Sequence, residues 1–470
     1  LNLYDMGSLL DASWRVFIGQ VPYRDFIAHV PPVHLYLNAF FFSLFGFGKV
    51  AILAHLIFVS SVLTLAVYGL VLRRVPTVVA ALIAALTMVS FYWSWSHPWY
   101  TATAHFWGLI GVLGVASAFG ETSHAPAAGR KIIGPDAAAL AAGLLSVFSF
   151  LSKPNVGFCY GALFLTVFCL SPRRAQVLGA YLLGGLAAFI AAWAIFFPSL
   201  SDFVYQTGVF CLTKASRITV LADPRVWFYD FYWVIALLAL CPSWKTWRCC
   251  PEQAVLLPGL WLVAVITAQT SGSLHEANSQ PLGPLAALAA LWIYRDSTGR
   301  MRKAVFCGLL TGALVVSVGY GLELRAWPDA PHSMRPTYRL LNGPLKGWGC
   351  DRLRGETLEA VCEFVIRYVP SSEPLLILTD MQIVNPLTGR DSYRHIPWNW
   401  DVYGLPAAGS QLRSVSGRLR ADSPIWILMN KSSDGYLAKL IPYLGLTEDL
   451  QLHYTVAMAW GDYWLLHRKF

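Results

Sequence analysis

Charged residues are scarce in this sequence. Asp, Glu, Lys and Arg make up 13% of its 470 residues, whereas 56% of the residues are hydrophobic. A soluble protein of this length needs more polar side chains than this to cover its surface, so the composition excludes that class. The mean hydropathy of +0.51 places the chain in a lipid bilayer instead.

Several long stretches lack charge altogether. A helix needs about 17–25 residues to cross the hydrocarbon layer, and about ten stretches reach or approach that length. They are residues 49–72, 76–94, 100–119, 136–151, 155–170, 175–198, 231–243, 254–270, 277–294 and 304–320, and the only charges within them are the first residues of two stretches, Lys49 and Asp136. We predict a mainly α fold, a polytopic bundle of transmembrane helices in which 155–170 and 231–243 are the shortest spans.

Basic residues mark every second connection between these stretches. They are Arg73 and Arg74, Arg130 and Lys131, Arg173 and Arg174, Lys245 and Arg248, and the group Arg295, Arg300, Arg302 and Lys303. By the positive-inside rule these connections are cytoplasmic, so the first 47 residues, the other connections and the tail face outward. An even number of spans then leaves both ends of the chain outside, which is an unusual arrangement. We therefore expect a further helix, entering from the cytoplasm, ahead of Leu1.

Composition divides the chain into three regions. Residues 1–47 form an outer loop, residues 48–323 a transmembrane helical domain, and residues 324–470 a small outward-facing α/β domain. In the outer loop the apolar positions Leu9, Leu10, Trp14, Phe17 and Ile18 follow helical spacing. They predict a helix lying on the membrane surface, and a second helix follows from Val33 to Phe45.

In the tail, apolar periodicity predicts two helices and four strands. The helices are 356–368 and 436–443, and the strands are 375–379, 425–429, 453–458 and 463–467. Cys350 and Cys362 are the only cysteines of the tail, on the side where disulfides persist, so we predict a bridge between them.

Metal-site spacings and charges at the membrane midplane are both missing. No pattern of cysteine and histidine resembles a zinc site, so we expect no cofactor, although a divalent metal stays an open alternative. The only ionisable residues well inside the spans are His55 and His105, which we interpret as packed neutral residues. Because ion-coupled transporters normally keep charges at the midplane, a binding or catalytic surface at the outer rim is favoured.

The outer rim is richest in polar motifs within the first loop. The loop reads Tyr4-Asp5-Met6-Gly7-Ser8, then Gly19-Gln20-Val21-Pro22-Tyr23-Arg24-Asp25-Phe26, then Pro31-Pro32 and Leu44-Phe45-Gly46. In order and spacing, these strings resemble the opening outer loop of the GT-C membrane glycosyltransferases. That superfamily includes the protein mannosyltransferases and the aminoarabinose transferases, and the resemblance extends more loosely over most of the chain.

The resemblance implies an inverting glycosyltransferase of the plasma (inner) membrane. Such an enzyme moves a hexosyl or pentosyl group from a polyprenyl-phosphate donor to a lipid, glycan or protein acceptor on the outer side. The acceptor hydroxyl needs a carboxylate to take its proton, and the resemblance places this base at Asp5. Asp25 is the alternative, because many relatives carry a second acid where this chain has Met6.

The donor phosphate and sugar require cations and hydrogen-bonding groups on the same face. Lys153, in the turn Ser152-Lys153-Pro154-Asn155, resembles the lysine at that place in relatives, though a lysine there also suits lipid headgroups. The candidates are Arg24, His97, Tyr100, Lys153, Asn155, Lys214, Arg217, His275, Glu276 and Asn278. In the tail, Asn385 to Arg390 ends in Thr-Gly-Arg, which we interpret as an ordinary turn without a catalytic role.

Two other classes of function remain open. A transporter or lipid flippase with an outward accessory domain agrees with the empty midplane if lipid moves passively. A glycan polymerase or ligase would take a diphosphate-linked oligosaccharide, and its dominant polar loop is expected late in the chain rather than first. Membrane lipids are expected partners and nucleic acid is not. The sequence leaves the sugar, the acceptor and the oligomeric state open.

Overall fold

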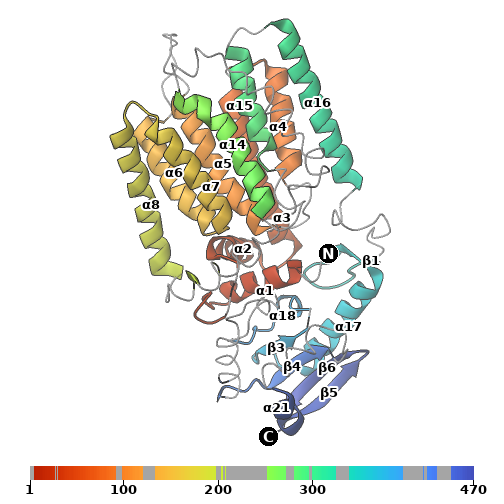
Figure 1. Ribbon diagram of the computed structural model, residues 1–470. Coiled ribbons are helices and arrows are strands. Elements are labelled where there is room, and N and C mark those ends of the chain that lie inside the picture. Colours follow the sequence, from red (N-terminus) through yellow and green to blue (C-terminus); the bar gives the residue numbers. More distant parts are fainter. Residues whose placement is uncertain are drawn as a thin grey trace. The chain divides into compact units, whose positions relative to one another are not determined.

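The computed structural model describes most of the chain. The described residues are 5–26, 28, 30–72, 74–91, 98–119, 133–196, 203, 204, 207, 251–270, 280–295, 299–323, 338–379, 381–394, 417, 421–430 and 446–469. They are mainly helical, with small sheets in the tail (Figure 1). The chain forms two compact units, the first made of Leu1–His55, Phe196–Thr213 and Ala330–Phe470, the second of Leu56–Ile195 and Lys214–Asp329.

The second unit is a bundle of apolar helices. Its described helices are α4 (Thr77–Phe91), α5 (Tyr100–Phe119), α6 (Pro135–Phe150), α7 (Pro154–Cys169), α8 (Arg174–Phe196), α14 (Pro251–Thr270), α15 (Leu282–Arg295) and α16 (Arg300–Glu323), and α3 (Lys49–Val71) enters it from the first unit. Each covers one of the predicted charge-free stretches, which confirms their helical state. The stretch 231–243 lies outside the described residues.

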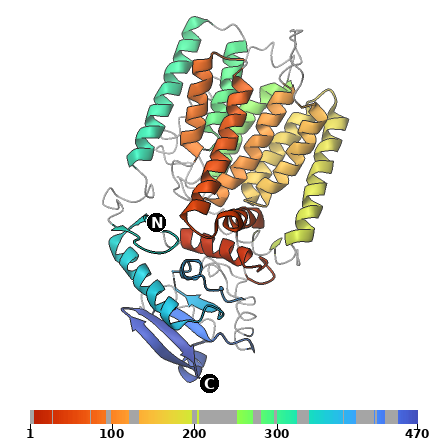
Figure 2. The same ribbon diagram turned by 180° about the vertical axis from the view of Figure 1, so that it is seen from behind.

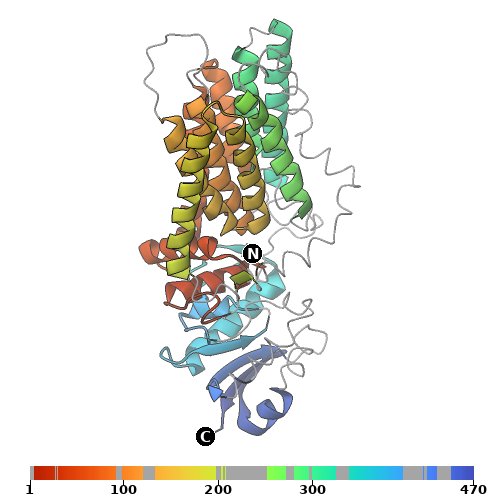
Figure 3. The same cartoon turned by 60° about the vertical axis from the view of Figure 1, so that its left-hand side comes forward.

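Length and composition single out three of the described helices as able to cross a membrane. These are α3, α5 and α8, whereas α4, α6 and α7 are shorter apolar helices. On α8 the side chains of Leu182, Leu186 and Ile190 are exposed and form an apolar face of the kind that lipid covers. Helix α8 runs along the outside of the bundle (Figure 3). The total number of spans stays a prediction.

Glycine lets the helices of the bundle approach closely. A Cβ atom on Gly143 of α6 would lie 2.0 Å from the carbonyl oxygen of Tyr181 in α8, and one on Gly184 would lie 2.1 Å from that of Leu140. Only glycine fits at such backbone contacts, which are common where helices pack in membranes. A larger residue at either position would push α6 and α8 apart.

The first unit joins the outer-loop helices to the tail. Its helices α1 (Asp5–Phe17) and α2 (Pro32–Phe45) were both predicted, and Gly46 ends α2 with a φ of 73°. The surroundings predicted for α1 are wrong. From Met6 to Val16 every residue is buried, so no face of this part of the helix is left for the membrane surface, and among its described side chains only that of the last residue, Phe17, is exposed.

The tail folds around a four-stranded sheet in the order β3-β4-β6-β5. Its elements are β1 (Tyr338–Arg339), β2 (Gly349–Cys350), α17 (Arg352–Tyr368), β3 (Leu375–Leu378), α18 (Val384–Thr388), β4 (Trp426–Asn430), α21 (Leu446–His453), β5 (Tyr454–Trp460) and β6 (Tyr463–Arg468). Strands β3 and β4 are parallel and the other pairs antiparallel, with α17 lying along the sheet (Figure 2).

The predicted tail elements are largely confirmed. Helix α17 and all four main strands lie where the pattern placed them, while 436–443 lies outside the described residues. The β1–β2 hairpin and the helices α18 and α21 were missed. Each has at most eight residues, too few for a periodic signal.

The predicted disulfide is wrong, because Cys350 and Cys362 are both free thiols. The sulfur of Cys350 lies against Gly355, where an added Cβ atom would be 2.7 Å away. Cys362 is seven residues further along α17, which corresponds to about 10 Å of helix. A bridge requires Cα atoms within about 7 Å, so these two cysteines do not meet.

Candidate functional site

One face of α1 carries a buried ion pair. Asp11 and Arg15 are one helical turn apart, and the Arg15 Nε lies 2.8 Å from the Asp11 Oδ2. Asp11 is 1% exposed and Arg15 5%. A pair this deeply buried requires further hydrogen bonds to satisfy both ions, and breaking one such pair costs on the order of 3–5 kcal/mol.

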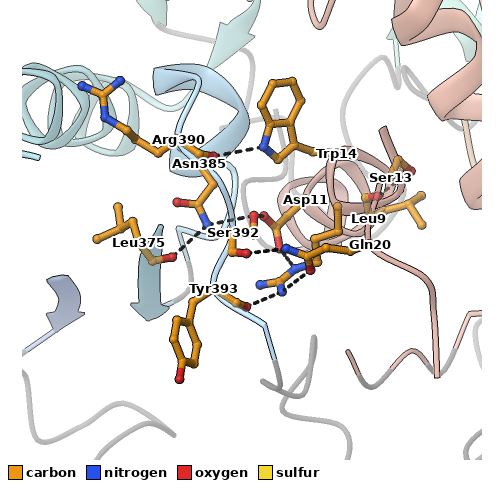
Figure 4. A network of polar contacts seen from close by, with 11 residues as sticks. Leu9, Asp11, Ser13, Trp14, Gln20, Leu375, Asn385, Arg390, Ser392 and Tyr393 are labelled. Atoms are coloured by element: carbon orange, nitrogen blue, oxygen red, sulfur yellow. Dashed lines mark hydrogen bonds and ion pairs between the residues drawn. The ribbon is translucent and has the colours of Figure 1, made fainter. Parts of the chain in front are cut away.

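The further hydrogen bonds to this ion pair come from the tail segment 390–393. The hydroxyl of Ser392 donates to Asp11 Oδ1 at 2.6 Å, and Arg15 Nη1 donates to the carbonyl oxygen of Tyr393 at 2.7 Å (Figure 4). On the same side, Trp14 donates to the Arg390 carbonyl oxygen at 3.1 Å. This segment therefore binds α1 through a row of polar contacts.

The same segment is fixed to the sheet. The Leu375 N–H donates to the carbonyl oxygen of Asp391 at 2.9 Å, and the Tyr393 N–H donates to that of Leu375 at 3.2 Å. Leu375 and Ser392 thus form a parallel bridge at the edge of β3. Outer loop and tail form one folded structure through these contacts.

The Thr-Gly-Arg string is part of this support. Residues predicted as a turn form the short helix α18, which Gly389 ends with a φ of 66°. The buried guanidinium of Arg390 donates to the carbonyl oxygens of Ile366, Val369 and Thr388, at 3.2, 2.9 and 2.9 Å. Burial lowers the pKa of Arg390 from its usual value. Arg390 therefore satisfies the end of α17 and acts as a structural residue.

Asp25, the alternative base, closes a tight loop. Arg24 Nη2 lies 2.7 Å from its Oδ2, which also accepts a hydrogen bond from the Val21 N–H at 2.8 Å. Burial raises the pKa of Asp25, but the hydrogen bonds from Arg24 and Val21 outweigh it and leave the pKa below its usual value. Between Val21 and Arg24 in the chain, Tyr23 adopts a φ of 68°, which is uncommon for a residue other than glycine.

Asp5 is the first residue of α1, and its side chain lies outside the described residues. Its neighbour Met6 is fully buried. Gly7, the glycine of the Asp-x-Gly string, faces the tail, where a Cβ atom on it would lie 3.3 Å from the Cβ of Ile383. The first turn of α1 is therefore in close contact with the residue that precedes α18.

Lys153 lies at the centre of a polar cluster with Tyr100 and Thr101 in the second unit. It precedes α7 and is only 7% exposed, and its ammonium donates to Thr101 Oγ1 at 2.7 Å. The ammonium also lies 5.0 Å from the centre of the Tyr100 ring, a cation–π contact. A lysine that reached out to lipid headgroups would expose its charge, so its burial favours a role inside the protein.

Tyr100 and Thr101 both belong to the first turn of α5, whereas Asn155 is the second residue of α7. Tyr100 and Asn155 are half-buried. The structure thus brings Lys153 and Tyr100 into contact, and Asn155 follows Lys153 by two residues in the chain.

The two histidines inside predicted spans are buried and hydrogen-bonded, as predicted for packed residues. His105 contacts the Tyr160 hydroxyl through Nδ1 at 2.9 Å. His55 contacts Asn38 Oδ1 through Nδ1 at 2.6 Å and stacks on the ring of Phe41.

The other donor-site candidates lie outside the described residues. They are His97, Lys214, Arg217, His275, Glu276 and Asn278. Among the residues that are described, no group of three or more His, Cys, Asp and Glu side chains could hold a metal ion.

Sequence reasoning missed the polar face of α1. Asp11 lies in the middle of α1 rather than at its start. An Asp and an Arg four residues apart within a mainly apolar helix were the available signal. Ser392 gave no signal at all.

No protein-family model and no curated relative matches the sequence. Among solved structures, ArnT from Cupriavidus metallidurans bound to undecaprenyl phosphate is 12% identical, with a TM-score of 0.53 over 99% of this chain and 94% of that chain. The archaeal oligosaccharyltransferase AglB from Archaeoglobus fulgidus, in complex with an inhibitory peptide and a dolichol-phosphate, is 12% identical, with a TM-score of 0.47 over 98% of this chain and 70% of that chain. The likeness to ArnT confirms the GT-C resemblance at the level of the fold.

Proposed function

We propose that the chain is a membrane glycosyltransferase that uses a polyprenyl-phosphate sugar as donor. The observation that carries the proposal is the buried Lys153 at the start of α7, in a chain with the fold of a protein that binds undecaprenyl phosphate. The acceptor is a lipid, a glycan or a protein. We place the reaction on the outer face of the membrane, because the basic connections mark the other face as cytoplasmic.

Lys153 supplies positive charge for the phosphate of the donor. Its contacts with Thr101 and Tyr100 hold the ammonium in one place, so little reorganisation is needed as charge develops on the leaving phosphate. A fixed cation in a water-poor site stabilises such charge more strongly than one in bulk solvent.

Asp5 acts as the general base in this proposal. The acceptor hydroxyl attacks the anomeric carbon of the donor while its proton passes to the Asp5 carboxylate. The bond from the anomeric carbon to the phosphate oxygen breaks, and polyprenyl phosphate leaves with the bonding electrons. A single displacement of this kind inverts the configuration at the anomeric carbon.

Asp25 is the less suitable base. Its carboxylate already accepts hydrogen bonds from Arg24 and Val21, and its pKa lies below the usual value. Both features weaken its ability to take a proton near neutral pH. We therefore assign the catalytic role to Asp5 and a structural role to Asp25.

We also propose that the transfer needs no metal, because Lys153 provides the charge for the phosphate. Turnover that persists in EDTA is the expected result. Turnover that stops in EDTA and returns with Mn²⁺ would contradict this part of the proposal.

The proposed function is tested with purified full-length protein in proteoliposomes. A panel of undecaprenyl-phosphate-linked monosaccharides serves as donor, and the release of undecaprenyl phosphate is measured by mass spectrometry. We expect release with at least one donor, dependent on an added membrane-extract acceptor fraction. A flippase would return every donor chemically unchanged, so complete recovery of intact donors across the panel would refute the transferase.

A further inference from the structure

The tail contacts α1 at two levels along its length. Near its start, Gly7 lies against Ile383, and one to two turns later Asp11, Trp14 and Arg15 bind the segment 390–393. Each residue of a helix turns by about 100° and rises by about 1.5 Å, so contacts at both levels fix both the rotation and the axial position of α1.

Ser392 is the central polar link in this contact. Its hydroxyl accepts a hydrogen bond from the Asn385 amide at 3.0 Å and donates one to Asp11 Oδ1 at 2.6 Å (Figure 4). The hydroxyl is therefore oriented by α18 and directed at α1. Its main-chain carbonyl oxygen accepts a further hydrogen bond, at 2.5 Å, from the side chain of Gln20.

The opposite side of α1 is fixed by different residues. Asn38 of α2 donates to the Ser13 hydroxyl at 3.1 Å, and Ser13 in turn donates to the Leu9 carbonyl oxygen at 2.9 Å. Ser13 and Asp11 lie on different sides of the helix, so this contact holds α1 on the side away from Ser392. Helix α1 is thus held between α2 and the tail.

We propose that Ser392 is a positioning residue for the transfer reaction, acting through Asp11 to hold the helix that begins at Asp5. The proposal rests on the function proposed above for Asp5. Ser392 is fully buried and does not itself reach a substrate. The tail is, on this view, a part of the catalytic apparatus that fixes the helix of the base.

The consequence for catalysis follows from the sensitivity of reaction rates to geometry. Without the Ser392 hydroxyl, Asp11 Oδ1 loses its partner in the tail, and the remaining contacts of Gly7, Trp14 and Arg15 hold α1 less tightly. A displacement of about 1 Å of a reacting group can cost on the order of 100-fold in rate. We therefore expect Ser392→Ala to lower kcat by about 10- to 100-fold while the KM for the donor stays within about twofold.

The test compares Ser392→Ala with Ser392→Thr, which keeps a hydroxyl, and with Ser372→Ala at an exposed serine of the same domain. Two measurements are made on full-length protein in detergent: turnover of the undecaprenyl-phosphate donor identified in the panel, and amide hydrogen exchange in α1 with no substrate present. We expect faster exchange across α1 and a lower kcat in Ser392→Ala only, with recovery in Ser392→Thr.

Unchanged exchange in α1, or unchanged kcat despite faster exchange, would overturn the proposal. A higher donor KM at unchanged kcat would also overturn it, because that result assigns Ser392 to binding. If Ser392→Ala does not insert and fold, Gly7→Ala tests the other level at which the tail contacts α1, at Ile383. Gly69→Ala, which has open space around its Cβ position, is its control. Asp5→Asn in the same assay tests the base separately, and exchange in α1 does not depend on that outcome.

Discussion

Replacing Lys153 by methionine removes the ammonium but keeps a side chain of similar length. The ammonium donates a hydrogen bond to Thr101 and makes a cation–π contact with Tyr100. Methionine fills the buried space, so we expect the thermal midpoint to change by only a few degrees.

The effect on binding should be much larger. A hydrogen bond to a charged group contributes about 1.5–3 kcal/mol, so the loss of Lys153 should weaken the binding of a phosphate monoester by about 10- to 150-fold. The probe is undecaprenyl phosphate itself, titrated against the protein in detergent and followed by intrinsic tryptophan fluorescence. Lys153→Arg should retain part of the affinity, because the charge remains.

Lys303→Met is the matched control. The Lys303 ammonium lies 5.1 Å from the centre of the Tyr294 ring, so this substitution also removes a lysine that contacts a tyrosine. We expect it to bind undecaprenyl phosphate as the unmodified protein does. Equal affinity in Lys153→Met and the unmodified protein would refute the role of Lys153 in phosphate binding.

Three further predictions concern the first unit. Arg390→Met leaves three carbonyl oxygens without their donor, and we expect a loss of about 3 kcal/mol in the free energy of unfolding, measured with denaturant; an unchanged value would contradict the structural role. The pKa of Asp25 is lowered from its usual value of 3.8, so the ionised carboxylate stabilises the fold at pH values above 3.8. This stability is lost as the pH falls through the lowered pKa. Asp25→Asn should therefore be less stable at pH 7 and lose less stability between pH 5 and 2 than the unmodified protein, by thermal midpoints; equal slopes would argue against the ion pair. Burial raises the pKa of Cys350 and raises that of Cys362 to about 12, so both thiols should react slowly with iodoacetamide at pH 8 in the folded protein and rapidly after denaturation without reductant. Alkylation is measured by mass spectrometry. If the denatured, unreduced protein is not alkylated at these cysteines, the predicted disulfide would be correct after all.

The helices of the bundle could be predicted because their signal is local. Absence of charge over a membrane-length stretch is a property of consecutive residues, and it located α3 to α8 without any knowledge of packing. The boundaries of α2 could be predicted for the same reason, since Pro31-Pro32 and Gly46 are strong local start and stop signals. Which helices pack together depends on backbone contacts such as that of Gly143, which no local pattern indicates.

The environment of α1 could not be predicted, because it depends on residues far away in the chain. Asp11 and Ser392 are 381 residues apart, and their hydrogen bond is one of the contacts by which the tail encloses the helix. The apolar stripe of α1 is the same for a helix on a membrane surface and for one packed against another helix. The position of Asp25 in a clamped loop likewise depends on the backbone conformation of Tyr23.

We propose that this chain transfers a sugar from a polyprenyl phosphate with Asp5 as the base. This proposal is tested most directly by measuring undecaprenyl phosphate release in Asp5→Asn and Asp25→Asn, each shown by size-exclusion chromatography to be folded. We expect Asp5→Asn to lose release by about 1,000-fold or more, within the range that general base catalysis contributes. Full release in Asp5→Asn together with loss in Asp25→Asn would contradict the proposal and assign the base to Asp25.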